Sequence, residues 1–201
     1  MEKLPVYKMS IENSEEGLTS ISLVEFPAIE RNFVTFSANK PVKFQINDEE
    51  KRIVTGALLL ADTPIYRNEN GEEYYIVIEK PEVFKTAQKF FKDGVQNSVN
   101  AEHTKNFFSG ITLFESFIVD ESRGISAPDP ELYGTIPEGS WVGSFFVESD
   151  EVWEEIKAGT FKGFSVEGWY SLEKISLTKE KTDVEEIAEI LELIEEIEKA
   201  Y

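Results

Sequence analysis

The chain contains no cysteine and only one histidine, His103. Without cysteine there is no disulfide framework, no thiolate nucleophile and no cysteine-ligated zinc site. A single histidine also cannot build a histidine-rich zinc site, and we expect neither a metal nor a cofactor. If the protein is a hydrolase that needs an imidazole base, only His103 can supply it.

Long hydrophobic runs and excess positive charge are also missing. No window approaches the ~20 apolar residues of a membrane-spanning helix, and the first residues are polar, with Glu2, instead of basic and then apolar. Twenty basic and thirty-nine acidic residues give a formal net charge of −19, which repels nucleic-acid phosphates. We therefore expect a soluble intracellular protein that binds neither membranes nor nucleic acids. Its acidity serves either solubility or docking onto a basic partner.

The composition nevertheless indicates a folded protein. Of the 201 residues, 41% are hydrophobic and 12% aromatic, enough to bury a core that offsets the entropy of ordering the chain. No glycine-rich loop ends in Lys-Ser or Lys-Thr, as a nucleotide-binding loop would. Several carboxylates, such as Asp129 and Glu131, lack the spacing of a calcium-binding loop. Nucleotide and metal chemistry therefore have no support in the sequence.

Hydrophobic periodicity predicts an α+β protein that is mainly β. The apolar run 52–61 is typical of a central strand buried on both faces, and the turn signal at 68–71 predicts a hairpin whose second strand is 74–78. Helical spacing predicts helices at 80–93 and 152–158. Other strands are expected at 6–11, 19–24, 33–36, 99–103, 111–119 and 141–147, with one or two more within 160–175. Residues 122–139 read as a long loop.

The last segment differs from the rest of the chain. Residues 183–201 contain eight acidic residues and one lysine, and their apolar residues recur every three or four positions. This pattern predicts an acidic amphipathic helix, too short to hold a coiled coil alone. The helix either packs on its own domain as an appendage or joins a partner in an oligomer. We therefore divide the chain into a β-rich domain, 1–178, and a C-terminal helix, 179–201.

Ser165 is the candidate nucleophile, in the segment Gly163-Phe164-Ser165-Val166-Glu167-Gly168. A serine hydroxyl becomes a good nucleophile only beside a base, which works best when a third group orients it. On an extended strand Ser165 and Glu167 share one face, while the two apolar residues point to the other. The glycine spacing differs from the lipase elbow. On spacing alone, a lone histidine in a polar stretch is most often a surface residue, and a serine between glycines most often lies in a turn.

Ordered blocks along most of the chain resemble the XkdF family of phage serine proteases. The resemblance begins with Ile21-Ser22-Leu23-Val24-Glu25-Phe26-Pro27-Ala28-Ile29 and ends with Lys162-Gly163-Phe164-Ser165-Val166-Glu167-Gly168. Between them lie similar blocks at 33–37, 56–67, 100–103, 115–120 and 137–142. Several blocks in one order are more specific than any single motif.

This family is similar to the prohead proteases of tailed phages, which share a β-barrel-like core with herpesvirus assemblins. The resemblance implies an assemblin-like barrel with a few peripheral helices, with His103 as the general base and Ser165 as the nucleophile. Assemblins orient the base with a second histidine, which this chain lacks. The third member must then be another group, and the candidates are Glu115 and Glu167, with Asp120 behind them.

The resemblance also implies a biological role. A prohead maturation endopeptidase would cleave the phage scaffold and major capsid proteins in the host cytoplasm, inside the assembling prohead, and would form a homo-oligomer. The alternative is a catalytically inert capsid-assembly or scaffold-binding protein on the same fold. One branch of prohead proteases cuts after glutamate in apolar-x-Glu sequences, and Ile187-Ala188-Glu189 is of that type. The acidic tail would then be a self-cleaved segment or a tether to the scaffold.

Overall fold

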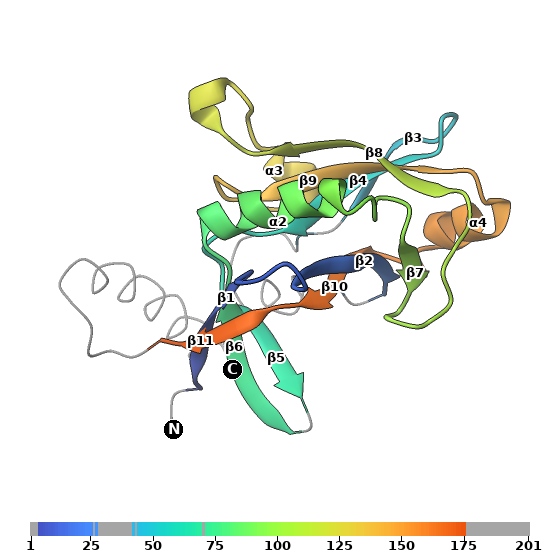
Figure 1. Ribbon diagram of the computed structural model, residues 1–201. Coiled ribbons are helices and arrows are strands. Elements are labelled where there is room, and N and C mark those ends of the chain that lie inside the picture. Colours follow the sequence, from blue (N-terminus) through green and yellow to red (C-terminus); the bar gives the residue numbers. More distant parts are fainter. Residues whose placement is uncertain (1–3, 26, 28–41, 43, 70, 176–201) are drawn as a thin grey trace.

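A computed structural model of the chain describes residues 4–25, 27, 42, 44–69 and 71–175 (Figure 1). The strands are β1 (Val6–Ser10), β2 (Gly17–Val24), β3 (Gln45–Asp48), β4 (Ile53–Leu59), β5 (Ile65–Glu69), β6 (Glu72–Val77), β7 (Val99–Ala101), β8 (Ile111–Ile118), β9 (Trp141–Val147), β10 (Gly163–Trp169) and β11 (Ser171–Lys174). The helices are α2 (Lys80–Lys92), α3 (Pro130–Tyr133), α4 (Asp150–Ala158) and the short 3₁₀ helix η1 (Glu121–Arg123). The mainly β, α+β class is confirmed.

The strands form three sheets, with the orders β11-β1-β6-β5, β10-β2-β7 and β3-β4-β9-β8. Two pairs are parallel, β1 with β6 and β2 with β7, and the others are antiparallel. Within the part of the chain that the structure describes, the sheets do not close into a barrel. The expected assemblin-like barrel is therefore not confirmed.

Strand β4 confirms the prediction of a central strand buried on both faces. Val54 and Leu58 belong to the larger core, whereas Ala57 belongs to a second core on the opposite face of the sheet. The second core also holds Val142 from β9 and Tyr133 from α3. Because neither face of β4 meets water, its sequence shows a continuous apolar run instead of alternation.

Helix α2 packs against both β2 and β9 and so joins two of the sheets (Figure 1). Its buried residues Val83, Ala87 and Phe90 recur at helical spacing, as the sequence predicted. The Phe90 ring meets Trp141 of β9 edge-on, with centroids 5.3 Å apart. Helix α4 ends at Ala158 as predicted and begins two residues earlier than predicted, at Asp150, because the Ser149 side chain caps its first turn and Gly159 its last. None of the described helices has the length and apolar content to cross a bilayer.

Three local expectations were wrong. Strand β7 ends at Ala101, so His103 lies in the turn after it. The region 122–139 is not a plain loop, because Asp120 and Asp129 cap the short helices η1 and α3 there. Ser165 lies in the middle of β10 and not in a turn, since neither neighbouring glycine has the positive φ of a tight turn. The expected strand at 33–36 and the C-terminal helix at 179–201 fall outside the residues described above.

Candidate active site

Three neighbouring strands place three polar side chains in a row. Ser165 on β10 pairs with Ser22 on β2, and Ser22 pairs with Asn100 on β7. Directly paired residues point to the same face of a sheet. Their neighbours along the same strands, such as Phe164 and Ile21, point to the opposite face and belong to the larger core. Ser165, Ser22 and Asn100 are 8%, 0% and 1% exposed, so this polar row is itself buried.

The turn that follows β7 carries His103 toward this polar row. Glu102 and His103 both have left-handed backbone conformations, with φ of 47° and 57°. Such conformations are uncommon for residues other than glycine and persist only where the surroundings hold them, often at functional sites. The Glu102 N–H donates to the Leu23 carbonyl (3.0 Å), and the Thr104 N–H donates to the Ala101 carbonyl (2.9 Å). The first bond therefore fixes the turn to β2, and the second is a hydrogen bond within the turn.

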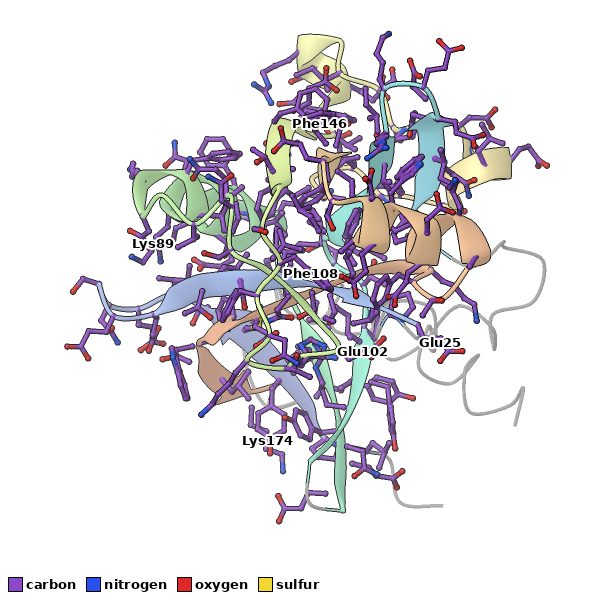
Figure 2. All side chains as sticks on the ribbon, turned by 90° about the vertical axis from the view of Figure 1, so that its right-hand side faces the viewer. Glu25, Lys89, Glu102, Phe108, Phe146 and Lys174 are labelled. Atoms are coloured by element: carbon purple, nitrogen blue, oxygen red, sulfur yellow. The ribbon has the colours of Figure 1, made fainter. Side chains whose placement is uncertain are left out.

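Both ends of this turn are anchored (Figure 2). The Glu102 carboxylate accepts a hydrogen bond from the Glu25 N–H, at 2.5 Å. The Phe108 N–H donates to the Val99 carbonyl at 2.8 Å, and the Phe108 ring packs edge-on against Phe161, with centroids 6.2 Å apart. These contacts hold the backbone of His103 in a defined place beside the sheet.

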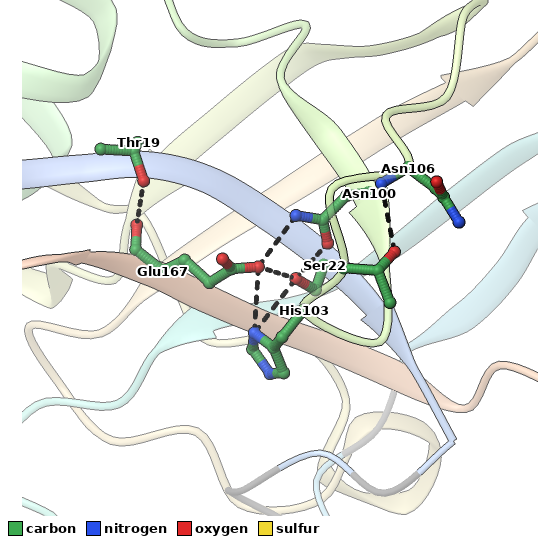
Figure 3. A network of polar contacts seen from close by, with 7 residues as sticks. Thr19, Ser22, Asn100, His103, Asn106 and Glu167 are labelled. Atoms are coloured by element: carbon green, nitrogen blue, oxygen red, sulfur yellow. Dashed lines mark hydrogen bonds and ion pairs between the residues drawn. The ribbon is translucent and has the colours of Figure 1, made fainter.

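His103 meets Glu167 in a network centred on one carboxylate oxygen (Figure 3). The distance from His103 Nδ1 to Glu167 Oε1 is 3.0 Å. The same Oε1 accepts from the Asn100 amide at 2.9 Å and lies 2.5 Å from Ser22 Oγ. Ser22 Oγ is also 3.2 Å from His103 Nδ1 and 2.5 Å from Asn100 Oδ1. The imidazole is thus held through one of its two nitrogens.

The environment of Glu167 favours its ionised form. Burial raises the pKa of Glu167, but hydrogen bonds from Ser22, Asn100 and His103 lower it, and the balance leaves this pKa below its ordinary value. The carboxylate is therefore negatively charged at neutral pH.

This charge fixes the tautomer of the imidazole. An ionised carboxylate only accepts hydrogen bonds, so a neutral His103 must carry its proton on Nδ1 to donate to Glu167. Nε2 is then unprotonated, and Figure 3 shows the far end of the ring pointing away from the network. A proton acceptor held in this way is the state that a general base requires.

Ser165, His103 and Glu167 line one cavity of about 650 Å³. The His103 side chain is 45% exposed, so the ring is accessible to a ligand. Within the described residues His103 makes no hydrogen bond with Ser165; the hydroxyl in contact with the ring is that of the fully buried Ser22. Longer separations between nucleophile and base are common in enzymes without substrate.

The other two candidate carboxylates lie elsewhere. Glu115 is exposed on β8, in another sheet, and pairs with Ser144. Asp120 accepts hydrogen bonds from Ser122 and from Arg123, which lower its pKa, and it caps η1. Across the described ranges neither one contacts His103, whereas Glu167 does.

Ser22 and Asn100 are site residues that the sequence analysis did not single out. Both lie inside blocks that resemble the XkdF family, but no role was assigned to them. A signal was present in β2, where Ser20 and Ser22 alternate with the apolar Ile21 and Leu23. Buried serines on one face of a strand need partners, and such a pattern indicates a polar site.

The rest of the cavity is lined by apolar side chains together with a few polar ones, among them Arg67 and Thr19. Its wall opposite β10 comes from β4, β5 and β6, and includes Leu58, Ile65 and Ile76. The Tyr170 hydroxyl is buried beside it without a hydrogen-bond partner in the described chain, and burial raises the pKa of this phenol. Trp169, 72% exposed, also lines the cavity. A cavity with apolar walls and a few convergent polar groups is typical of a ligand site.

A serine, an imidazole and a carboxylate around one cavity, with the carboxylate on Nδ1, are the groups of a serine hydrolase site. Comparison with known proteins gives the family. Residues 41–173 match the family described as "Putative phage serine protease XkdF", and the chain belongs to that family. The matched range includes His103, Ser165 and Glu167, and the resemblance seen in the sequence is confirmed.

Two proteins of Bacillus subtilis (strain 168) are similar to the chain. One is "Uncharacterized protein YqbD", 28% identical over 178 residues, which cover 83% of this chain and 49% of that protein. The other is "Phage-like element PBSX protein XkdF", 27% identical over 170 residues, which cover 80% of this chain and 55% of that protein. The chain thus spans about half the length of these relatives. No solved structure matches it.

Proposed function

We propose that the protein is a serine endopeptidase in which Ser165 is the nucleophile, His103 the general base and Glu167 the group that orients the base. The proposal depends chiefly on one observation: Glu167 Oε1 lies 3.0 Å from Nδ1 of the sole histidine. Ser165 is on the same strand as Glu167 and lines the cavity that Glu167 and His103 share. Family membership supports the same chemistry.

The proposed reaction has two steps. His103 Nε2 takes the proton of Ser165 Oγ while this oxygen attacks the carbonyl carbon of the peptide bond. The resulting tetrahedral intermediate collapses, the C–N bond breaks, and the leaving amine takes the proton from Nε2. Water then gives a proton to Nε2 and its oxygen to the acyl carbon. The bond between this carbon and Ser165 Oγ breaks, Oγ takes the proton back from Nε2, and the acid is released. Backbone N–H groups near Ser165 are the proposed donors to the oxyanion.

The substrate is proposed to lie along β10. This strand is at the edge of its sheet, with β2 on one side, and the cavity runs along its residues from Phe164 to Tyr170. An extended peptide fits such an edge, because the strand offers its main-chain groups for pairing. The apolar wall from Ile65 and Ile76 would receive a side chain of the peptide.

The proposed biological role is maturation of a phage head. The family description and the name of one relative both refer to phage. The substrates would be the scaffold and major capsid proteins, cleaved in the host cytoplasm inside the assembling prohead by a homo-oligomer of the protease. We also propose that the protease domain is distantly related to the herpesvirus assemblins, as the family resemblance implies.

A second candidate function is an inert assembly or scaffold-binding protein. The hydroxyl bonded to His103 is that of the fully buried Ser22, and not that of Ser165. An inert protein could retain this network for stability alone.

The deciding experiment is incubation with the cognate scaffold and capsid proteins, together with labelling by a fluorophosphonate probe. The wild type should cleave and be labelled at Ser165, whereas Ser165→Ala and His103→Ala should do neither. Ser144→Ala is the matched control, because Ser144 is a buried serine of β9, in another sheet, whose hydroxyl lies 2.8 Å from that of Thr55. Unchanged cleavage in Ser165→Ala or His103→Ala would reject this mechanism, and absence of wild-type cleavage would favour the inert protein.

A further inference from the structure

Two buried polar side chains take no part in the proposed chemical steps. Ser22 and Asn100 are 0% and 1% exposed, so neither meets solvent or substrate. Buried polar groups cost free energy unless they are hydrogen-bonded, and these two bond to each other and to Glu167. Apolar residues at these positions would avoid that cost, which points to a role beyond packing.

The contacts define how the network is arranged. Asn100 directs its NH₂ group to Glu167 Oε1 (2.9 Å) and its carbonyl oxygen to Ser22 Oγ (2.5 Å). Ser22 has one proton and two acceptors, Asn100 Oδ1 and Glu167 Oε1, both at 2.5 Å, so it donates to one of them at a time. The oxygen of Ser22 remains free to accept from His103 Nδ1–H, at 3.2 Å.

Strand pairing makes this arrangement rigid. Asn100 lies directly beside Ser22 in the parallel pair of β2 and β7. Glu167 is on the opposite neighbour of β2, where the register shifts between Glu167 and Gly168. The central strand therefore holds Ser22 between Asn100 on one side and Glu167 on the other.

We propose that Ser22 and Asn100 are positioning residues, which hold Glu167 Oε1 against Nδ1 of His103 and so keep Nε2 unprotonated and available to Ser165. The inference rests on the proposed function for its catalytic meaning, although the network itself can be measured without activity. Asn100 fixes the carboxylate from one side, while Ser22 bridges the carboxylate and the ring.

Removing either Ser22 or Asn100 takes away a hydrogen-bond donor to the Glu167 carboxylate. Without the Asn100 amide, Glu167 loses one of the hydrogen bonds that lower its pKa, and its carboxylate is free to rotate. Without the Ser22 hydroxyl, it loses another, and the Asn100 carbonyl loses its donor. In both cases the Nδ1–H tautomer loses its preference, and the fraction of His103 that can act as a base falls.

The test uses the fact that His103 is the only histidine. In protein labelled with ¹⁵N-histidine, one ring supplies both ring-nitrogen signals, and they need no assignment by mutation. In its neutral form the wild-type ring should carry its proton on Nδ1 and none on Nε2. Ser22→Ala and Asn100→Ala should shift the ring toward a mixture of tautomers and raise the pKa of the Glu167 carboxyl in a ¹³C titration. Ser22→Thr, which keeps the hydroxyl, should restore the wild-type tautomer, and Ser144→Ala, a change of a buried serine in another sheet, should not alter it.

Activity gives the second readout. Both alanine variants should lower kcat by roughly 100-fold with little change in KM, as expected when a catalytic group is misplaced while the binding surface is intact. A neutral wild-type ring that carries its proton on Nε2 would overturn the inference. An unchanged tautomer together with an unchanged Glu167 pKa in both folded variants would do the same. So would loss of fluorophosphonate labelling in Ser22→Ala with retention in Ser165→Ala, because Ser22 would then be the nucleophile. An inactive wild type with the expected tautomer would reject the protease proposal and leave the positioning network intact.

Discussion

The imidazole of His103 lies 3.0 Å from the carboxylate of Glu167, although 63 intervening residues separate the two in the chain. They meet because β7 and β10 flank the same central strand, β2. The contact selects Glu167 among the carboxylates considered from the sequence, and the proposed role of Glu167 can be tested through both stability and catalysis.

Glu167→Gln should lower stability in a pH-dependent way. The pKa of Glu167 is below its ordinary value in the folded protein, so its ionised form stabilises the fold above the unfolded-state pKa. This contribution is lost as the pH falls through the folded-state pKa. Urea unfolding should therefore show a deficit in Glu167→Gln at pH 7 that shrinks toward pH 3. A deficit that is constant over this range would contradict the assignment of an ionised Glu167.

The same substitution should also affect catalysis. A glutamine amide can donate to Nδ1 and so favour the tautomer that carries its proton on Nε2, which cannot act as a base. We expect kcat to fall by about 10⁴-fold, the scale seen when a triad carboxylate becomes an amide. Glu115→Gln is the control, because Glu115 lies on β8, and it should retain wild-type kcat. Equal losses in the two variants would exclude a specific role for Glu167.

Two tyrosines provide a matched test of buried hydroxyl groups. Tyr170→Phe removes a buried hydroxyl that has no partner in the described residues, and it should raise the free energy of unfolding by about 1 kcal/mol. Tyr133→Phe removes a hydroxyl that accepts from the Asn47 amide at 2.7 Å, and it should lower the free energy by about 1 kcal/mol. Chemical denaturation of both variants checks the opposite signs. Destabilisation by Tyr170→Phe would show that its hydroxyl has a partner.

Gly168→Ala should disturb the strand that carries the site. A Cβ at this position would lie 2.2 Å from the carbonyl oxygen of Gly17, a backbone atom of the neighbouring strand. Overpacking against a backbone atom should destabilise the protein by about 1–3 kcal/mol and reduce cleavage by moving Glu167. Gly159→Ala is the comparison, because its Cβ meets open space and only the positive φ of 76° opposes it. Thermal unfolding should rank Gly168→Ala as the more damaging change only if β10 and β2 are as close as described.

Self-cleavage of the acidic tail can be tested by mass spectrometry of purified protein. If residues 179–201 are removed by the protein's own activity, the wild type should lose part of this segment after a glutamate, and Ser165→Ala should keep it. Intact tails in both proteins would reject self-processing. Equal trimming in both would assign the cleavage to another protease.

Much of the fold was predictable because it depends on local patterns. The alternation in β1 and β2, the apolar run of β4, the hairpin turn before β6 and the caps of α4 are each encoded within a few residues. The strand position of Ser165 was harder to predict, because Gly163 and Gly168 are typical of turns, yet here they allow close approach of Pro27 and Gly17.

The sequence by itself determined the possible base, since a chain with one histidine has one imidazole. It also determined, through ordered blocks, the family to which the chain belongs. Only the tertiary structure decided which carboxylate meets that imidazole, and that Ser22 and Asn100 hold it. The reason is physical: β10, β2 and β7 come from distant parts of the chain, and their register sets which side chains lie opposite one another. Local alternation sets which face of each strand is buried, but no hairpin turn joins these strands to fix which residues lie opposite one another.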